Sequence, residues 1–239
     1  MSQVDWLERL DALLARGIGH SDDYDTAKLQ LAIFYYLTKA SRAARASIRM
    51  AQTGSFTEAL LLLRGLYDLV VDCLWMCLDP VVRARLFYDA TAVGFERQRE
   101  LLKELGVTDF EADTVEAIEH NRRHFEQAGH QFKTKRGNDR PHWSPGTIRD
   151  RAAEIERVDP DMEGIENLYL MLYKVLSAYE HSEPALCFQF VAISEGTFRA
   201  AAEPSMLSPQ AFGSALGLLL GALVKRASGH LGLTLEDFK

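Results

Sequence analysis

Several features that mark other protein classes are scarce in this sequence. Its 239 residues include three cysteines and seven prolines, too few for a disulfide-bonded miniprotein or a collagen. The cysteines, Cys73, Cys77 and Cys187, are an odd number, and the amphipathic, acidic start differs from an export signal. We therefore expect reduced thiols and a soluble cytoplasmic protein. Basic residues do not predominate either: the net charge of −7 gives no overall attraction to nucleic acid or anionic lipid.

Long apolar runs are also missing. The longest, from Ala211 to Val224, has 14 residues without a charge, whereas a membrane span needs about 20 apolar residues. Within this run Gly213, Gly217 and Gly221 recur every four residues, a spacing that lets another helix approach closely. We expect this segment to pack against a close neighbour, within the chain or in a second copy, and not in a membrane. We expect the protein to form a homodimer in solution.

Helical periodicity and capping signals dominate what is present. The apolar content of 47% is typical of a globular domain, and apolar residues recur at helical spacing along most of the chain. Residues 55–58 and 108–111 match the capping box, in which a side chain at each end of the motif accepts a bond from a free amide. Ser144-Pro145 and Ser208-Pro209 place proline at a first helical position.

Two segments depart from the helical pattern. Residues 186–193 are rich in β-forming residues and precede Ser194-Glu-Gly196, which predicts one short β-hairpin near 186–199. Residues 129–146 form a polar, basic loop with three glycines and two prolines. The sequence therefore predicts an all-α fold: a single helical-bundle domain over 1–239, with seven or eight helices and this loop between two of them.

Two sets of polar side chains lie on predicted helix faces. Tyr173, Ser177 and His181 recur every four residues, so all three share one face. They form either a proton relay or ligand-binding set, or a buried hydrogen-bond network. Arg64 and Asp68 interrupt an apolar helix at the same spacing. A guanidinium there needs a partner, so the two either neutralise each other in the core or line a polar pocket.

A third set, Glu116, His120 and His124, has the spacing of half a metal site. A second helix with a matching Glu-x-x-His pair is missing. We therefore expect a solvated polar face, with no metal and no other cofactor.

Basic residues concentrate in one stretch. Residues 122–151 hold eight Lys or Arg against three Asp or Glu, a local charge of +5. Together with Trp143 and three histidines, this composition suits either a phosphate or single-stranded RNA site, or a solvated basic loop. The candidate phosphate-binding residues are Lys133, Lys135, Arg136 and Arg140.

Three segments, spread over about residues 55–185, resemble an uncharacterised bacterial family of helical proteins known as a domain of unknown function. They are Glu58–Asp68, Trp143–Arg149 and Tyr173–His181. The resemblance implies a helical bundle without an assigned reaction, in which polar side chains of these segments come together as a network. The residues it marks are Arg64, Asp68, Trp143, Arg149, Tyr173, Ser177 and His181.

The segment Arg123-His124-Phe-Glu-Gln-Ala-Gly-His130 is similar to the active-site motif of HEPN ribonucleases from toxin–antitoxin and phage-defence systems. This likeness implies a metal-independent ribonuclease acting across a homodimer. His130 would act on the 2′-hydroxyl and Arg123 would stabilise the phosphorane. We expect Gly129 to end the helix before His130.

Two functions therefore remain. The first is a ligand-binding or interaction module with a buried Arg/Asp/Tyr/His network, serving stress response or phage defence. The alternative is a HEPN-like ribonuclease that uses Arg123 and His130.

Overall fold

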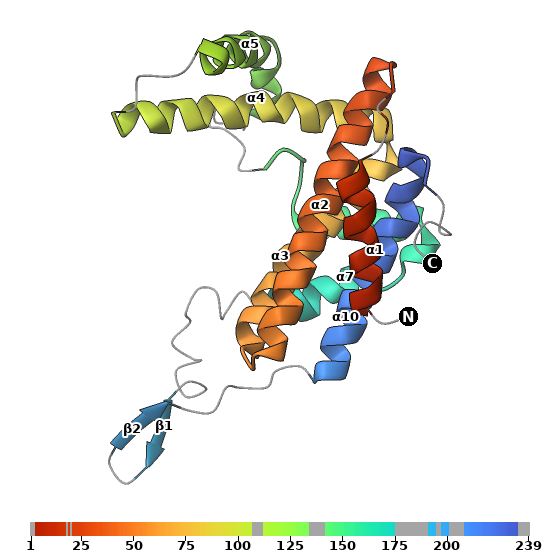
Figure 1. The fold of residues 1–239 in the computed structure, drawn as a ribbon, viewed down its shortest axis with the longest axis vertical. Helices are drawn as coiled ribbons and strands as arrows, with labels where there is room; N and C mark the ends of the chain where they lie inside the picture. Colours follow the sequence, from red (N-terminus) through yellow and green to blue (C-terminus); the bar gives the residue numbers. More distant parts are fainter. Residues whose placement is uncertain are drawn as a thin grey trace. The chain divides into compact units, whose positions relative to one another are not determined.

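A computed structural model describes residues 3–17, 19, 21–106, 112–133, 142–174, 191–194, 197–200 and 208–233 (Figure 1). The fold is all-α, as predicted, with one small hairpin. The helical elements are α1 (Gln3–Arg16), α2 (Tyr24–Gln52), α3 (Phe56–Leu78), α4 (Pro80–Glu104), α5 (Ala112–Ala128), η1 (Gly129–Phe132), α6 (Ile148–Val158), η2 (Pro160–Met162), α7 (Ile165–Leu168), η3 (Tyr169–Lys174), α10 (Pro209–Ala227) and η5 (Ser228–Leu231).

The predicted hairpin is present. Strands β1 (Val191–Ser194) and β2 (Thr197–Ala200) pair antiparallel, with Val191 opposite Ala200 and Ser194 opposite Thr197. The residues between the strands, 195 and 196, lie outside the described part of the chain.

The chain packs into two compact units. The larger comprises Met1–His20, Ile33–Leu78 and Gly146–Lys239, and the smaller comprises Ser21–Ala32 and Asp79–Pro145. The chain passes from one unit to the other between His20 and Ser21, within α2, at the Leu78–Asp79 junction and at the Pro145–Gly146 junction. The described residues of the basic loop before Gly146 therefore lie in the smaller unit. The single domain expected over residues 1–239 stays a prediction.

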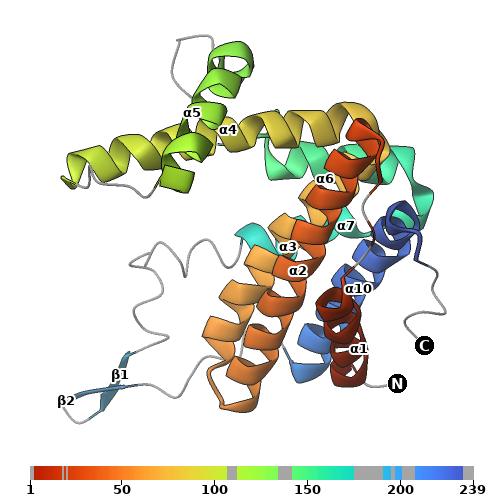
Figure 2. The same cartoon turned by 45° about the horizontal axis from the view of Figure 1, so that its top comes forward.

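Helix α3 is the central element of the larger unit. Its apolar residues face all round the helix, and most of them are buried, including Leu63, Leu66 and Val70. Helix α10 packs along α3, and both views of the ribbon show the two helices side by side (Figures 1 and 2). The rings of Phe56 and Phe212, at the start of each helix, lie 5.6 Å apart. Helices α3 and α10 therefore run parallel.

Helix α6 covers a second face of α3 through polar contacts. Arg151 Nε lies 2.9 Å from Asp72 Oδ1, and both side chains are almost fully buried, with 5% and 7% exposed. One turn on, the Trp75 indole N–H donates to Glu154 at 2.6 Å. Because both residue numbers rise together along the contact, α6 also runs parallel to α3. The chain then reverses through η2, and the Tyr67 hydroxyl donates to the Ile165 carbonyl at 2.9 Å.

The predicted start of α6 at Ser144-Pro145 is wrong. The helix begins at Ile148, and Thr147 caps it in a capping box with Asp150. Gly146 has φ +71°, a left-handed conformation that interrupts a right-handed helix. The Ser144 hydroxyl instead lies 2.7 Å from His142 Nδ1.

In the smaller unit α4 packs against α5. Helix α5 ends at Ala128, and a single 3₁₀ turn follows from Gly129. The helix thus ends before His130, as expected. A Cβ atom built at Gly129 would lie 2.8 Å from the Phe125 ring, so glycine is required for this close approach.

Replacing Arg151 by Met should lower the free energy of unfolding by about 3–5 kcal/mol, because the Asp72 carboxylate stays buried without its cation. Combining Asp72→Leu with Arg151→Met should recover most of this loss, since an apolar pair then replaces the whole ion pair. Urea denaturation followed by circular dichroism measures both changes. A loss below about 1 kcal/mol in Arg151→Met would show that the ion pair does not hold α6 to α3.

Candidate functional site

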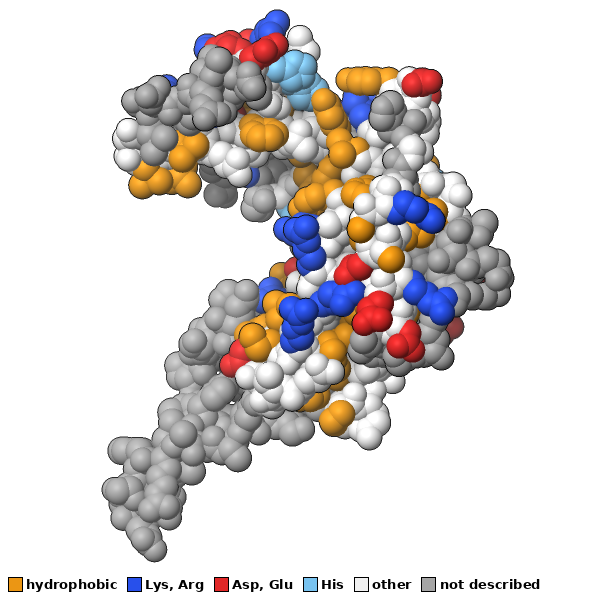
Figure 3. All heavy atoms as spheres, in the orientation of Figure 1, with side chains coloured by type: hydrophobic (Ala, Val, Ile, Leu, Met, Phe, Trp, Pro, Cys, Tyr) orange, Lys and Arg blue, Asp and Glu red, His pale blue; other side chains and the backbone are white. Residues whose placement is uncertain are grey.

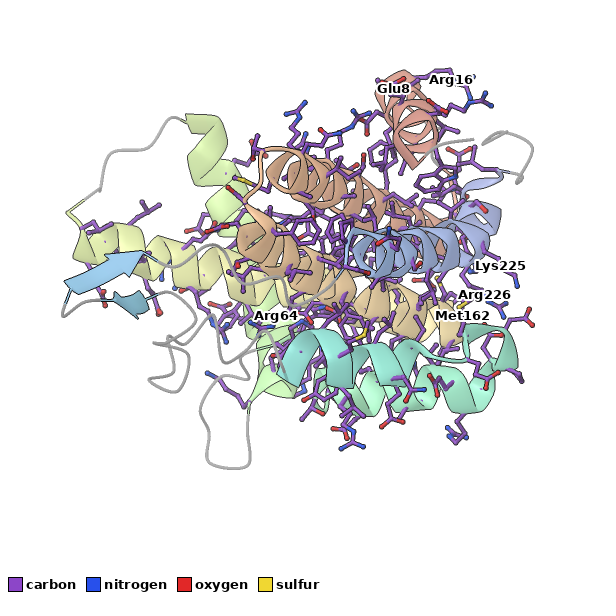
Figure 4. The ribbon with its side chains drawn as sticks, turned by 90° about the horizontal axis from the view of Figure 1, so that it is seen from below. Glu8, Arg16, Arg64, Met162, Lys225 and Arg226 are labelled. Atoms are coloured by element: carbon purple, nitrogen blue, oxygen red, sulfur yellow. The ribbon has the colours of Figure 1, made fainter. Side chains whose placement is uncertain are left out.

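Arg64 and Tyr173 come together in the larger unit. The guanidinium carbon of Arg64 lies 4.2 Å from the centroid of the Tyr173 ring, which is the geometry of a cation–π contact. Arg64 and Tyr173 are half-buried, as is Asp68, one turn along α3. In Figure 4, Arg64 is labelled beside the teal ribbon of the segment that carries Tyr173. Arg64 is thus neither sealed in the core nor fully solvated.

The segment that carries Tyr173 is a π-helix, η3 (Tyr169–Lys174). The Tyr169 and Tyr173 rings stack at a centroid distance of 5.0 Å and an interplanar angle of 18°. A π-helix is rare and its wider turn is less stable than an α-helical turn, so it persists where the surroundings hold it, frequently at functional sites. Arg64, Tyr169 and Tyr173 are called the arginine–tyrosine cluster below.

Tyr67 holds the start of this segment against α3. Burial, together with the negative charge of Asp68, raises the pKa of Tyr67 well above its ordinary value. The phenol therefore stays protonated and donates to the Ile165 carbonyl. This hydrogen bond fixes where α7, and the π-helix directly after it, lie along α3.

The other predicted network residues lie elsewhere or outside the described residues. Arg149 is exposed, and its Nε donates to Glu166 at 2.9 Å. The Trp143 ring lies 5.3 Å from the Phe87 ring within the smaller unit. Ser177 and His181 fall outside the described part of the chain.

The residues predicted for RNA cleavage are exposed in the smaller unit. Arg123 Nε bonds the Glu119 carbonyl on its own helix at 3.5 Å, and His130 lies on η1. Lys133, next to η1, is exposed as well. Lys135, Arg136 and Arg140 lie outside the described residues.

His124, predicted as part of a possible metal half-site, contacts a carboxylate. Its Nε2 lies 3.1 Å from Asp89 Oδ1, and Gln131 donates to the other oxygen of Asp89 at 3.0 Å. Among the described residues, no group of three or more His, Cys, Asp or Glu side chains is arranged to hold a metal ion.

Sequence reasoning missed the buried pair Asp72–Arg151. Half of this pair could have been found in the sequence: Asp72 follows two valines within the apolar run of α3, so it is a charged residue at a position expected to be buried. It also missed exposed basic residues on α2. Figure 3 shows Lys and Arg side chains over this helix, with acidic and apolar side chains among them. The exposed basic residues of this stretch are Lys39, Arg42 and Arg49.

The three glycines that recur every four residues in α10, Gly213, Gly217 and Gly221, do not form the face that packs on α3. The packing face is made of buried residues such as Leu216, Leu219 and Leu223. Gly221 is exposed, and a Cβ built there meets nothing within 4 Å among the described residues. Within the described chain, one helical segment, Pro209–Leu231, is long and apolar enough to cross a membrane, but half of its apolar window is buried in the protein. A core helix of a soluble protein has the same properties.

The fold and this cluster define an all-α protein with a guanidinium over one ring of a stacked tyrosine pair. The model of a family of unknown function, DUF5677, matches residues 30–198, and the chain belongs to this family. The match runs from within α2 into β2 and includes the arginine–tyrosine cluster. No curated protein and no solved structure matches the sequence.

The contact between Arg64 and Tyr173 should be measurable as a coupling energy. We expect a double-mutant cycle of Arg64→Met and Tyr173→Leu to give about 0.5–2 kcal/mol, the range for a cation over an aromatic ring at a half-buried position. The free energy of unfolding of the four proteins supplies the cycle. If the two effects add to within about 0.3 kcal/mol, the two side chains do not interact measurably.

Proposed function

We propose that this protein is a ligand-binding module that takes a small anionic ligand, a phosphate or a carboxylate, at the arginine–tyrosine cluster. The observation that carries the proposal is the position of Arg64 over Tyr173. The contact places the Arg64 guanidinium over the Tyr173 ring at a half-buried position. A planar fork of N–H donors matches a phosphate or carboxylate with two parallel hydrogen bonds.

The stacked tyrosines support the same conclusion. Tyr169 lies against Tyr173, so the ring under Arg64 is itself held in place. A pre-positioned guanidinium loses less side-chain entropy on binding than a free one. The π-helix also supports a functional role. If this turn served only to hold two tyrosines in contact, the more stable α-helical turn could do the same.

Asp68 sets the charge balance of the site. Its carboxylate lies one turn from Arg64 on α3, half-buried. A nearby carboxylate weakens the attraction for a dianion and favours a ligand that also offers a hydrogen-bond donor, such as a hydroxyl or amine. The site therefore suits a small polar metabolite with one acidic group better than a free polyanion.

Thermal unfolding at pH 6 tests the proposal with two probes that carry one negative charge and a hydroxyl, dihydrogen phosphate and lactate. A ligand at 100 times its Kd stabilises by about 2.7 kcal/mol, a rise in Tm of about 5–10 °C for a chain of this size. We expect at least one probe to raise Tm and Arg64→Met to abolish the rise. Arg149→Met is the matched control, since it removes an exposed arginine of the same unit. Equal shifts in Arg64→Met and the unmodified protein would reject the site.

The alternative, a HEPN-like ribonuclease, is supported by the exposure of Arg123, His130 and Lys133 in one unit. It also requires a homodimer, for which the exposed glycine of α10 offers a close-packing surface. It is the weaker proposal, because Arg123 bonds its own helix and His130 has no partner residue that orients it for catalysis among the contacts described above.

His130→Ala distinguishes the two functions. If the protein cleaves RNA, the variant should lose cleavage by about 10²–10⁴-fold while keeping its RNA affinity, since acid–base catalysis acts in the transition state. Electrophoresis of a labelled single-stranded RNA measures cleavage, and filter binding measures affinity. The control is His120→Ala, which removes an exposed histidine of α5 in the same unit. Cleavage that persists in His130→Ala would reject the HEPN-like mechanism.

A further inference from the structure

A lysine of the smaller unit is buried against two tyrosine rings. Lys28, in the second turn of α2, is 8% exposed. Its Nζ atom lies 3.9 Å from the centroid of the Tyr24 ring and 4.7 Å from that of the Tyr88 ring of α4. In Figures 1 and 2 the start of α2 lies beside the first turns of α4. Lys28, Tyr24 and Tyr88 are called the lysine–tyrosine cluster below.

Two acidic residues, each directly after a tyrosine of this cluster, are bound elsewhere. The two carboxylate oxygens of Asp25 accept bonds from Arg85 at 2.9 and 2.8 Å. One oxygen of Asp89 lies 3.1 Å from His124 Nε2, and the other accepts a bond from Gln131 at 3.0 Å. Among the residues that the structure describes, no oxygen accepts a hydrogen bond from the ammonium of the cluster.

The Lys28 ammonium is therefore only partly compensated for its burial. Burying a charge is unfavourable unless an ion pair or hydrogen bonds replace its hydration. The two rings supply a cation–π attraction, which replaces part of that hydration. An oxyanion of a ligand would supply the hydrogen-bond acceptors that the described residues do not. A phosphate suits this position, because an ammonium binds it as a point charge and needs no fixed fork of donors.

A second lysine–tyrosine contact on α2 shows what distinguishes the first. Lys39 Nζ lies 5.6 Å from the centroid of the Tyr35 ring. Lys39 is exposed, so water can satisfy its ammonium without a ligand. The difference between the two contacts is the burial of the lysine, and not the presence of a tyrosine ring beside it.

The exposed ring of Tyr24 adds a stacking surface. Tyr24 is 65% exposed although the ammonium lies over one face of its ring, so the opposite face is open to solvent. A planar ligand ring stacked on that face would lie about 3.5 Å from the tyrosine ring, whereas the ammonium lies 3.9 Å away on the other side. A ligand that uses both features therefore needs a spacer between its ring and its phosphate.

We propose that the lysine–tyrosine cluster is a binding site for a phosphate monoester that carries a planar ring on a short spacer, the chemistry of a nucleoside monophosphate. The base stacks on Tyr24 and the phosphate binds Lys28, which Tyr88 holds in place. Stacking tolerates any base, because every base has a π-face. The site is independent of the arginine–tyrosine cluster, which lies in the larger unit.

Calorimetric titration with adenosine monophosphate (AMP) tests this site in the Arg64→Met protein, in which the arginine–tyrosine cluster is absent. AMP should bind saturably. Adding Lys28→Met should weaken binding about 10–100-fold, because a charge-assisted hydrogen bond is lost. Adding Tyr24→Ala should weaken it about 10–100-fold as well, because the stacking is lost. The matched controls Lys39→Met and Tyr35→Ala should change the Kd by less than about twofold.

Inorganic phosphate distinguishes a nucleotide site from a simple anion site. Because it lacks the ring, it should bind the Arg64→Met protein about 10–100-fold more weakly than AMP. Equal affinities would overturn the nucleotide assignment. An absence of saturable AMP binding, or an unchanged AMP affinity after Lys28→Met, would overturn the site itself. The AMP titration does not use Arg64, so failure of the arginine–tyrosine site would leave its outcome unchanged.

NMR of the unmodified protein keeps the proposal testable if a variant fails to fold. The ring resonances of Tyr24 and Tyr88 should shift when AMP is added, because the base and the phosphate change the surroundings of both rings. The ring of Tyr35, beside the exposed Lys39, should keep its resonances. Resonances of Tyr24 and Tyr88 that do not move at any AMP concentration would overturn the proposal.

Discussion

The ion pair between Asp72 and Arg151 determines how the second half of the larger unit attaches to the first. Helix α3 buries apolar side chains nearly all round, so a carboxylate at Asp72 has no access to water and requires a cation from another element. Arg151 supplies that cation and also donates to the Gly146 carbonyl. The pair therefore places α6 along α3, and the Trp75–Glu154 hydrogen bond sets its direction. Without Arg151, burying Asp72 would be strongly unfavourable.

The candidate site follows from that attachment. Once α6 is placed, the chain reverses at η2 and returns along α3, where Tyr67 bonds the Ile165 carbonyl. This contact leaves the next turn, the π-helix, opposite Arg64. The polar groups of α3 therefore act in order along the helix. Tyr67 and Asp72 fix the incoming segments, and Arg64 lies over the Tyr173 ring.

The sequence predicted the features that depend on neighbours in the chain. Helix periodicity and the proline and serine signals gave most helices, and β-forming residues gave the hairpin at 191–200. The start of α6 was missed because the left-handed conformation of Gly146 depends on a turn that a proline signal hides. Arg64 and Tyr173 were linked only through resemblance to a family. The partner of Asp72 was missed because Arg151 is far away in the chain, and pairing at that range depends on how the helices pack.

The parallel course of α3 and α10 has a consequence for how the chain folds during synthesis. The face of α3 that α10 covers is complete by residue 78, yet the covering leucines are not translated until residues 216–223. More than a hundred residues therefore leave the ribosome while an apolar helix face lacks its partner. Contacts of such long range slow folding and expose apolar surface to aggregation in the meantime. A nascent chain that stops before α10 would be a natural client for a chaperone that binds exposed apolar helices.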